Sequence, residues 1–313
     1  MTLLLLIVAL AVALPWAAAP AATRLAGLLP PRAASVTLAG AATLLAGGAV
    51  AALVGLFHVP FLAMLEHLRL DQVTADWPAV LPVSCAAGAL LVAQTVRLTL
   101  AARRQRALLS SAWRLTGECA AEGDVLVVPG EDAEAFALPG FRGRAGRVVV
   151  TEGMLGLLGP SERAVLFAHE RAHLRGRHHA FSAVVVLAAA VHPALARLGP
   201  ALDFHLERWA DEAAATVAGD RRTAATAIAR AALAGAAGSG GRGGRFPSVS
   251  TGPVPLRVRA LLEPEPAGPR GRGPRAAAAA LVAAVVVSAV LALGLAYGLH
   301  EYVEHSAREI VGR

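Results

Sequence analysis

The chain has 313 residues, of which 56% are hydrophobic and 16% are charged, and its formal net charge is +7 at pH 7. This length allows one or two domains, and the apolar composition indicates a membrane protein with a modest soluble part. The positive charge comes from arginines that gather beside apolar segments. That placement indicates membrane topology and argues against direct nucleic acid binding.

Four apolar segments are long enough to cross a hydrocarbon core of about 30 Å at roughly 1.5 Å per helical residue. They cover residues 1–19, 34–59, 79–100 and 276–299. No positive charge precedes the first segment, which favours a transmembrane helix over a signal peptide. The second is expected to stop at Pro60. The predicted fold is mainly α, with about four transmembrane helices.

Arginines flank alternate crossings. Arg24 and Arg32 lie between the first and second spans, a group that ends at Arg106 lies at the end of the third span, and three arginines between residues 270 and 275 precede the fourth. The loop between the second and third spans holds only Arg69. Because positive residues favour the cytoplasmic side, we predict a multi-pass protein of the cell membrane with both termini outside. The chain then divides into a transmembrane region of three helices (1–106), a cytoplasmic domain (107–264), and a hinge, fourth span and short tail (265–313).

The cytoplasmic domain contains the pattern His-Glu-Arg-Ala-His at residues 169–173. Gly159 and Pro160 precede its helix, with Ser161 as the expected N-cap. Residues four apart share one helix face, so His169 and His173 can hold one zinc ion while Glu170 reaches a water on that metal.

The spacing suits the chemistry of a zinc peptidase. Two neutral imidazoles leave the zinc electrophilic enough to polarise a carbonyl and to acidify a water. Glu170 can take the water's proton and later return it to the leaving amine. A third protein ligand is needed, with the fourth position open for water.

The segment Leu-Glu-Arg-Trp-Ala-Asp-Glu at residues 206–212 can supply that ligand. Glu207 is the candidate, and Asp211, one turn later, can accept the second ring N–H of a ligating histidine. We therefore predict one Zn²⁺ per chain. His178 and His179 are expected in an exposed basic tail, and His192 at a helix end.

Residues 181–198 form a further apolar run. If they crossed the membrane, Glu207 would lie on the opposite side from His169 and His173. We therefore predict a buried or membrane-dipping helix, interrupted near His192. Charged residues around the motif helix also argue against a site within the bilayer. An alanine-rich helical region (213–237), a glycine-rich linker (238–244) and a short amphipathic helix (255–262) follow.

Two short β-branched runs, at residues 125–128 and 147–151, are predicted strands. Zinc peptidases use an exposed strand edge to pair with an extended substrate. Simple core strands are an equally good interpretation of these runs.

Four motifs in order, at residues 135–140, 147–155, 168–178 and 207–211, resemble the BlaR/MecR-type membrane zinc metallopeptidases, most of all their short actinobacterial form, and HtpX-type peptidases share much of the pattern. The resemblance implies a gluzincin-like α+β domain between the third and fourth spans. It implies zinc bound by His169, His173 and Glu207, Glu170 as general base, and Asp211 supporting the ligands. It also implies cleavage of a protein at the cytoplasmic face, within a regulatory cascade in the well-known members.

The chain departs from the receptors of this family after the last span. They carry a large extracellular penicillin-binding sensor there, whereas only residues 300–313 follow here. Antibiotic sensing by that route is therefore not expected. The leading function is a membrane-anchored zinc endopeptidase of protein or peptide substrates, with a cytoplasmic transcriptional repressor as one candidate. The alternative is a non-catalytic zinc-binding signalling or scaffold protein. A transporter ranks last, because it would need polar or charged residues within the spans and these are nearly absent.

Overall fold

The computed structural model describes residues 2–65, 74–75, 78–116, 121–238 and 253–263, together with the single residues 276, 279, 283 and 286. Apart from those single positions, the predicted fourth span lies outside the described residues. The hinge before it and all but the first residue of the glycine-rich linker lie outside them as well.

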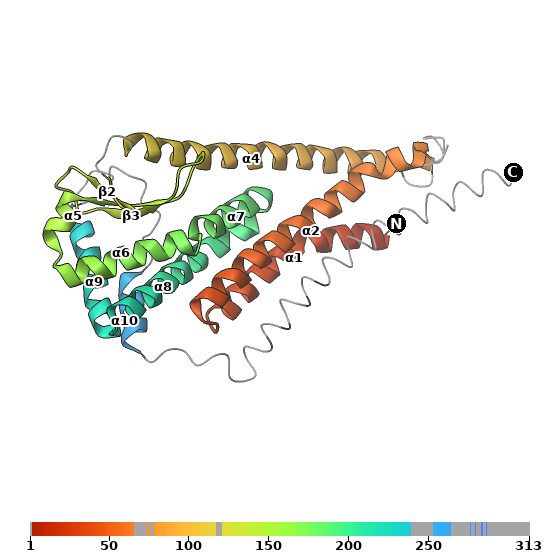
Figure 1. Ribbon diagram of the computed structural model, residues 1–313. Helices are drawn as coiled ribbons and strands as arrows, with labels where there is room; N and C mark the ends of the chain where they lie inside the picture. The colour runs from red at the N-terminus through yellow and green to blue at the C-terminus, as the bar shows by residue number, and fades with distance from the viewer. Residues whose placement is uncertain are drawn as a thin grey trace.

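The first two helices, α1 (Thr2–Ala26) and α2 (Pro31–Leu65), lie side by side as a hairpin (Figure 1). The second helix continues beyond Pro60, where the sequence had predicted its stop. A proline removes one helical hydrogen bond and bends the helix, but the remaining bonds can carry the helix past it. The two helices share a core with three later elements, namely α7 (His178–Val191), the 3₁₀ turn η1 (Pro193–Arg197) and α8 (Leu198–Ala218). Residues such as Ala19, Leu38, Val185, Leu195 and Leu202 belong to this core.

The third predicted span is the beginning of a single helix, α4 (Val80–Leu115), that runs the length of the molecule (Figure 1). The predicted span ended near Leu100, but the helix continues through the arginines that follow. Alanine, leucine, arginine and glutamine all favour helix, and no glycine or proline interrupts this stretch. The predicted domain boundary at 107 therefore lies inside α4.

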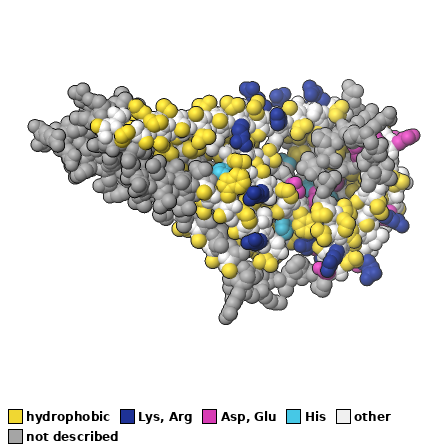
Figure 2. Space-filling model, turned by 180° about the vertical axis from the view of Figure 1, so that it is seen from behind, with side chains coloured by type: hydrophobic (Ala, Val, Ile, Leu, Met, Phe, Trp, Pro, Cys, Tyr) yellow, Lys and Arg dark blue, Asp and Glu magenta, His cyan; other side chains and the backbone are white. Residues whose placement is uncertain are grey.

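Among the described residues, two helices are long and apolar enough to cross a membrane, namely Pro31–His58 of α2 and the whole of α4. The most apolar window of α2 is 44% buried within the protein, whereas that of α4 is only 6% buried. Hydrophobic side chains cover one part of α4, and basic side chains gather further along it (Figure 2). Both helices indicate a membrane protein, and α4 does so more strongly because little of the chain covers it.

A small sheet follows, made of β1 (Ala121–Glu122), β2 (Val125–Val128), β3 (Ala135–Leu138) and β4 (Arg147–Thr151). The strand order is β1-β2-β4-β3. Strands β2 and β4 run parallel, and β3 pairs with β4 in the antiparallel sense. Both predicted strands are confirmed, and β3 forms an edge of the sheet.

The sheet is covered on both faces. On one face, Trp113 near the end of α4 packs against Leu126, Leu138 and Val149, and its indole N–H donates to the Pro139 carbonyl at 2.9 Å. On the other face, Val148 and Val150 pack against α5 (Glu152–Leu157), α6 (Pro160–Arg175) and α9 (Arg221–Gly238). The apolar strands thereby hold α6, the motif helix, in place.

The motif helix begins two residues earlier than predicted. Pro160 is its first residue and Gly159 its N-cap, so the prediction of Ser161 as N-cap is wrong. The carboxylate of Glu162 accepts the N–H of Gly159 at 2.9 Å. Proline suits the first helical position because its missing N–H would have no helical partner there.

Three helical segments follow α6, namely α7 (His178–Val191), the 3₁₀ turn η1 (Pro193–Arg197) and α8 (Leu198–Ala218). The predicted interruption near His192 is confirmed. The alanine-rich region is divided between α8 and α9, because Gly219 takes a left-handed conformation with φ of 69° and ends α8. The predicted short helix is confirmed as α10 (Val254–Leu262).

Candidate metal centre

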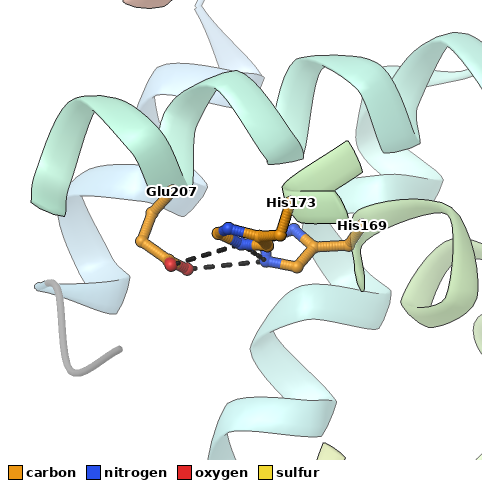
Figure 3. Close-up of side chains that lie close together, drawn as sticks. All are labelled: His169, His173 and Glu207. Atoms are coloured by element: carbon orange, nitrogen blue, oxygen red, sulfur yellow. Dashed lines mark hydrogen bonds and ion pairs between the residues drawn. The ribbon is translucent and has the colours of Figure 1, made fainter. Parts of the chain in front are cut away.

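Helices α6 and α8 pack together and bring three potential metal ligands to one point (Figure 3). His169 and His173 project from the same face of α6, and Glu207 reaches them from α8. The two histidine Nε2 atoms are 3.2 Å apart. The Glu207 carboxylate oxygens lie 3.5 Å from Nε2 of His169 and 3.4 Å from Nε2 of His173.

These separations fit a tetrahedral zinc ion. With metal–ligand distances of about 2.0–2.2 Å, tetrahedral ligand atoms lie about 3.3–3.6 Å from one another. The donor set of two imidazoles and one carboxylate is one that catalytic zinc sites use. No fourth protein ligand joins the three in the described part of the chain, so one position is left for water or substrate.

Asp211 lies behind the first ligand, as the sequence predicted. Its Oδ1 is 3.0 Å from Nδ1 of His169, and the side chain is almost completely buried. A carboxylate at this nitrogen holds the proton on Nδ1 and leaves the Nε2 lone pair free for a metal.

Arg257, from α10, joins the two buried carboxylates and was not found by sequence reasoning. Its Nη1 is 2.8 Å from Glu207, and its Nε and Nη2 donate to Asp211 at 2.8 and 2.6 Å. The side chain is buried and balances two negative charges. The predicted amphipathic helix at 255–262 carries two arginines, Arg257 and Arg259, and nothing in the sequence distinguishes one from the other.

The electrostatics of the centre favour a cation between the rings. Burial lowers the pKa of His169, but the side chains of Asp211 and Glu207 outweigh it and raise this pKa to about 10. Burial raises the pKa of Glu207, but His169, His173 and Arg257 together lower it to about 2. The carboxylates therefore stabilise positive charge at the point where the three ligand atoms meet.

Glu170 occupies a dry environment next to the edge strand. Its side chain is buried, and burial raises its pKa to about 7, against the charges of His169 and Arg257 and a hydrogen bond from the Ala137 N–H. A carboxylate whose pKa lies near neutrality can accept a proton and return it. Because Ala137 belongs to β3, this edge of the sheet lies beside the candidate base.

His178 is not in an exposed tail, so this expectation is wrong. It is 2% exposed, and its Nδ1 lies 2.8 Å from Nδ1 of His173. Arg177 takes a left-handed conformation with φ of 51°, which turns the chain back so that α7 begins with His178 against the motif helix. His179 is exposed, as expected. His192 ends α7, as expected, and its ring accepts the N–H of Ala194.

Comparison with protein-family models gives one match, in which residues 101–203 match Peptidase family M48. The matched segment covers the end of α4, the sheet and the motif helix, and it stops just before Glu207. The comparisons with curated proteins and with solved structures gave no match. The match supports the predicted resemblance to membrane metallopeptidases, and it does not distinguish the BlaR/MecR type from the HtpX type.

Proposed function

We propose that the chain, whose residues 101–203 match the model of Peptidase family M48, is a membrane-anchored zinc endopeptidase that cleaves proteins at the cytoplasmic face. The observation that carries the proposal is the convergence of His169, His173 and Glu207 at separations that fit zinc, with Glu170 beside them. A closed structural site would instead need a fourth protein ligand.

The residues divide the work of peptide hydrolysis. His169, His173 and Glu207 would hold the zinc, which supplies Lewis-acid chemistry for the carbonyl and the water. Glu170 takes a proton from the attacking water and donates it to the departing amine. Asp211 and Arg257 keep His169 and Glu207 oriented, since Asp211 lies against Nδ1 of His169 and Arg257 forms an ion pair with the carboxylate of Glu207.

An extended substrate has a place to bind along β3. This strand pairs with β4 on one side, and in the described part of the chain no strand covers its other side. A peptide that pairs with the free edge gains backbone hydrogen bonds whatever its sequence. Because the N–H of Ala137 on this strand reaches Glu170, a bound peptide bond would lie close to the candidate base.

Two observations support a site at the cytoplasmic face. The apolar part of α4 continues into the segment whose Trp113 packs against the sheet, so one helix joins the proposed membrane anchor to the sheet that supports the motif helix. The guanidinium of Arg32, in the first turn of α2, lies 5.5 Å from the ring of Trp209, so the end of the α1–α2 hairpin that carries Arg24 and Arg32 lies beside α8. Loops rich in arginine favour the cytoplasmic side. A cytoplasmic transcriptional repressor or a membrane protein is the substrate class we propose.

The test compares the purified full chain in detergent with Glu170→Gln and with Glu152→Gln, an exposed glutamate of α5 as control. We expect about one zinc per chain in all three proteins, and cleavage of labelled casein by the unmutated chain and by Glu152→Gln. Loss of the base should slow Glu170→Gln by roughly 10²–10⁴-fold.

Two results would contradict the proposal. A chain that retains no zinc after purification in zinc-containing buffer would contradict the metal assignment. Zinc-loaded protein that cleaves no unfolded or membrane substrate, with or without Glu170, would favour the non-catalytic scaffold instead.

A further inference from the structure

We propose that His178 is a positioning residue of this zinc site, in which its Nδ1 accepts a hydrogen bond from Nδ1–H of His173 and thereby aims Nε2 of His173 at the metal. The inference rests on the proposed function. It assigns to the site a residue that lies outside both the metal-binding motif and the downstream segment with Glu207.

The first argument is the match between the two ligating histidines. Both present Nε2 to the point where the ligand atoms meet, so in each neutral ring the single proton lies on Nδ1. Nδ1 of His169 faces Asp211 at 3.0 Å. Nδ1 of His173 faces Nδ1 of His178 at 2.8 Å. Each ligand thus has one buried partner that can receive its proton, a carboxylate in one case and an imidazole in the other.

The second argument concerns the other nitrogen of His178. If Nδ1 accepts, the proton of this ring lies on Nε2, and Nε2 is buried without a hydrogen-bond partner among the described residues. Leaving a buried donor unpaired costs about 1–3 kcal/mol. An apolar side chain would avoid this cost. A histidine at this position must therefore make a favourable contact that outweighs the cost of the unpaired Nε2–H. That contact is the one between its Nδ1 and His173.

The third argument is that the surroundings fix the ring in this orientation. The ring packs against Trp209, with centroids 4.5 Å apart, and meets the ring of His173 edge-on at 4.6 Å. Gly176 leaves the necessary space, since a Cβ atom there would lie 2.5 Å from Nε2 of His178. Trp209 comes from α8, between Glu207 and Asp211, so the same helix that supplies the third ligand also holds His178.

The experiment measures Zn²⁺ and Co²⁺ affinity, by chelator competition, and the absorption spectrum of the Co²⁺-loaded full chain in detergent. The variants are His178→Phe, which removes the acceptor, and His178→Asn, whose side-chain oxygen can replace Nδ1. His179→Phe is the control, because His179 is the exposed neighbour. We expect His178→Phe to lose roughly 10–100-fold in metal affinity and to change the cobalt spectrum. His178→Asn and His179→Phe should stay close to the unmutated chain.

Thermal unfolding of the metal-free proteins separates positioning from simple packing. A packing residue would lower the midpoint in His178→Phe, whereas a positioning residue should leave it nearly unchanged, because the variant removes the unpaired Nε2–H of His178 and leaves the Nδ1–H of His173 unpaired in its place. If His178→Phe does not fold, the metal affinities of His178→Asn and His178→Gln are compared instead. Asparagine places its oxygen near the position of Nδ1 and should retain the affinity, whereas glutamine places its oxygen near that of Nε2 and should lose it.

Equal metal affinity and an identical cobalt spectrum in the unmutated chain and His178→Phe would overturn the inference while leaving the proposed function intact. Failure of the unmutated chain to bind either metal would overturn both.

Discussion

At the scale of single residues, the three candidate metal ligands are contacted by three further side chains, those of Asp211, Arg257 and His178. His169 and His173 lie one helical turn apart, so sequence spacing alone places them together, and Glu207 and Asp211 repeat that spacing on a second helix. Arg257 reaches them only through tertiary packing of α10. His178 follows a left-handed residue, Arg177, and no sequence pattern predicts that a bulky arginine will adopt this conformation.

Arg257 should therefore matter far more to stability than its neighbour on the same helix. Arg257→Leu leaves two buried carboxylates without their cation, and breaking a buried pair in this way costs about 3–5 kcal/mol. The control is Arg259→Leu, because Arg259 pairs with Glu263 through a side chain that is 75% exposed. A surface pair of this kind contributes at most about 1 kcal/mol.

Thermal unfolding of the metal-free proteins in detergent measures both effects. We expect a clear loss of stability in Arg257→Leu and almost none in Arg259→Leu. Equal midpoints for the two variants would mean that Arg257 does not balance Glu207 and Asp211.

At the scale of elements, the strands and the motif helix were predicted well because their signals are local. The start of α6 differs from the predicted one by two residues, because Gly159 is the N-cap and its N–H is accepted by Glu162. The length of α4 was underestimated because hydropathy reports the end of an apolar surface, whereas helix formation depends on backbone propensity, which continues through the arginines. The position of β3 at the sheet edge depends on pairing between distant segments, which the sequence pattern does not specify.

The short helix α5 offers a test of how the sheet is joined to the helices. Gly153 donates its N–H to the Gly130 carbonyl at 2.8 Å, and a Cβ atom there would lie 2.2 Å from the carbonyl oxygen of Glu131. Gly153→Ala should therefore force the loop after β2 away from α5 and destabilise the domain by about 1–3 kcal/mol.

Gly156, in the same helix, is the matched control because nothing lies within 4 Å of its added Cβ. Gly156→Ala should be neutral or stabilising by about 0.5–1 kcal/mol, since alanine favours helix over glycine. Thermal unfolding midpoints measure the stability of both variants. A Gly153→Ala variant as stable as Gly156→Ala would show that the loop after β2 moves away from α5 at little energetic cost.

At the scale of the whole molecule, hydropathy identified the apolar helices but could not assign them to lipid or to protein. α2 is long and apolar enough to span a membrane. Its N-terminal half, however, packs against α7 and α8, so protein takes the place of lipid there. α4 is also long and apolar enough, but only 6% of its most apolar window is buried within the protein. Only the three-dimensional contacts separate the two cases, because composition is the same for a buried helix and a lipid-facing one.

Two leucines of α4 with equal exposure test which part of this helix meets lipid. Leu90 is 53% exposed and lies in the predicted span, whereas Leu108 is 52% exposed and follows the arginines. Leu90→Arg should impair membrane integration, since an arginine near the centre of a span costs about 2.5–3.5 kcal/mol. Leu108→Arg should have no effect. Alkaline carbonate extraction of membranes measures the integrated fraction, and equal extraction of the two variants would mean that another protein covers the apolar face.

The unbroken course of α4 has a geometric consequence for substrate choice. Its 36 residues extend about 54 Å at roughly 1.5 Å per residue, and a hydrocarbon core takes up about 30 Å of this length. In the proposed membrane orientation, the remainder would carry Trp113 and the sheet to a fixed height above the lipid, because a continuous helix cannot shorten. A peptide bond in a membrane-bound substrate would reach Glu170 only from a juxtamembrane segment of matching length, so selection would depend on where the bond lies as well as on its side chains.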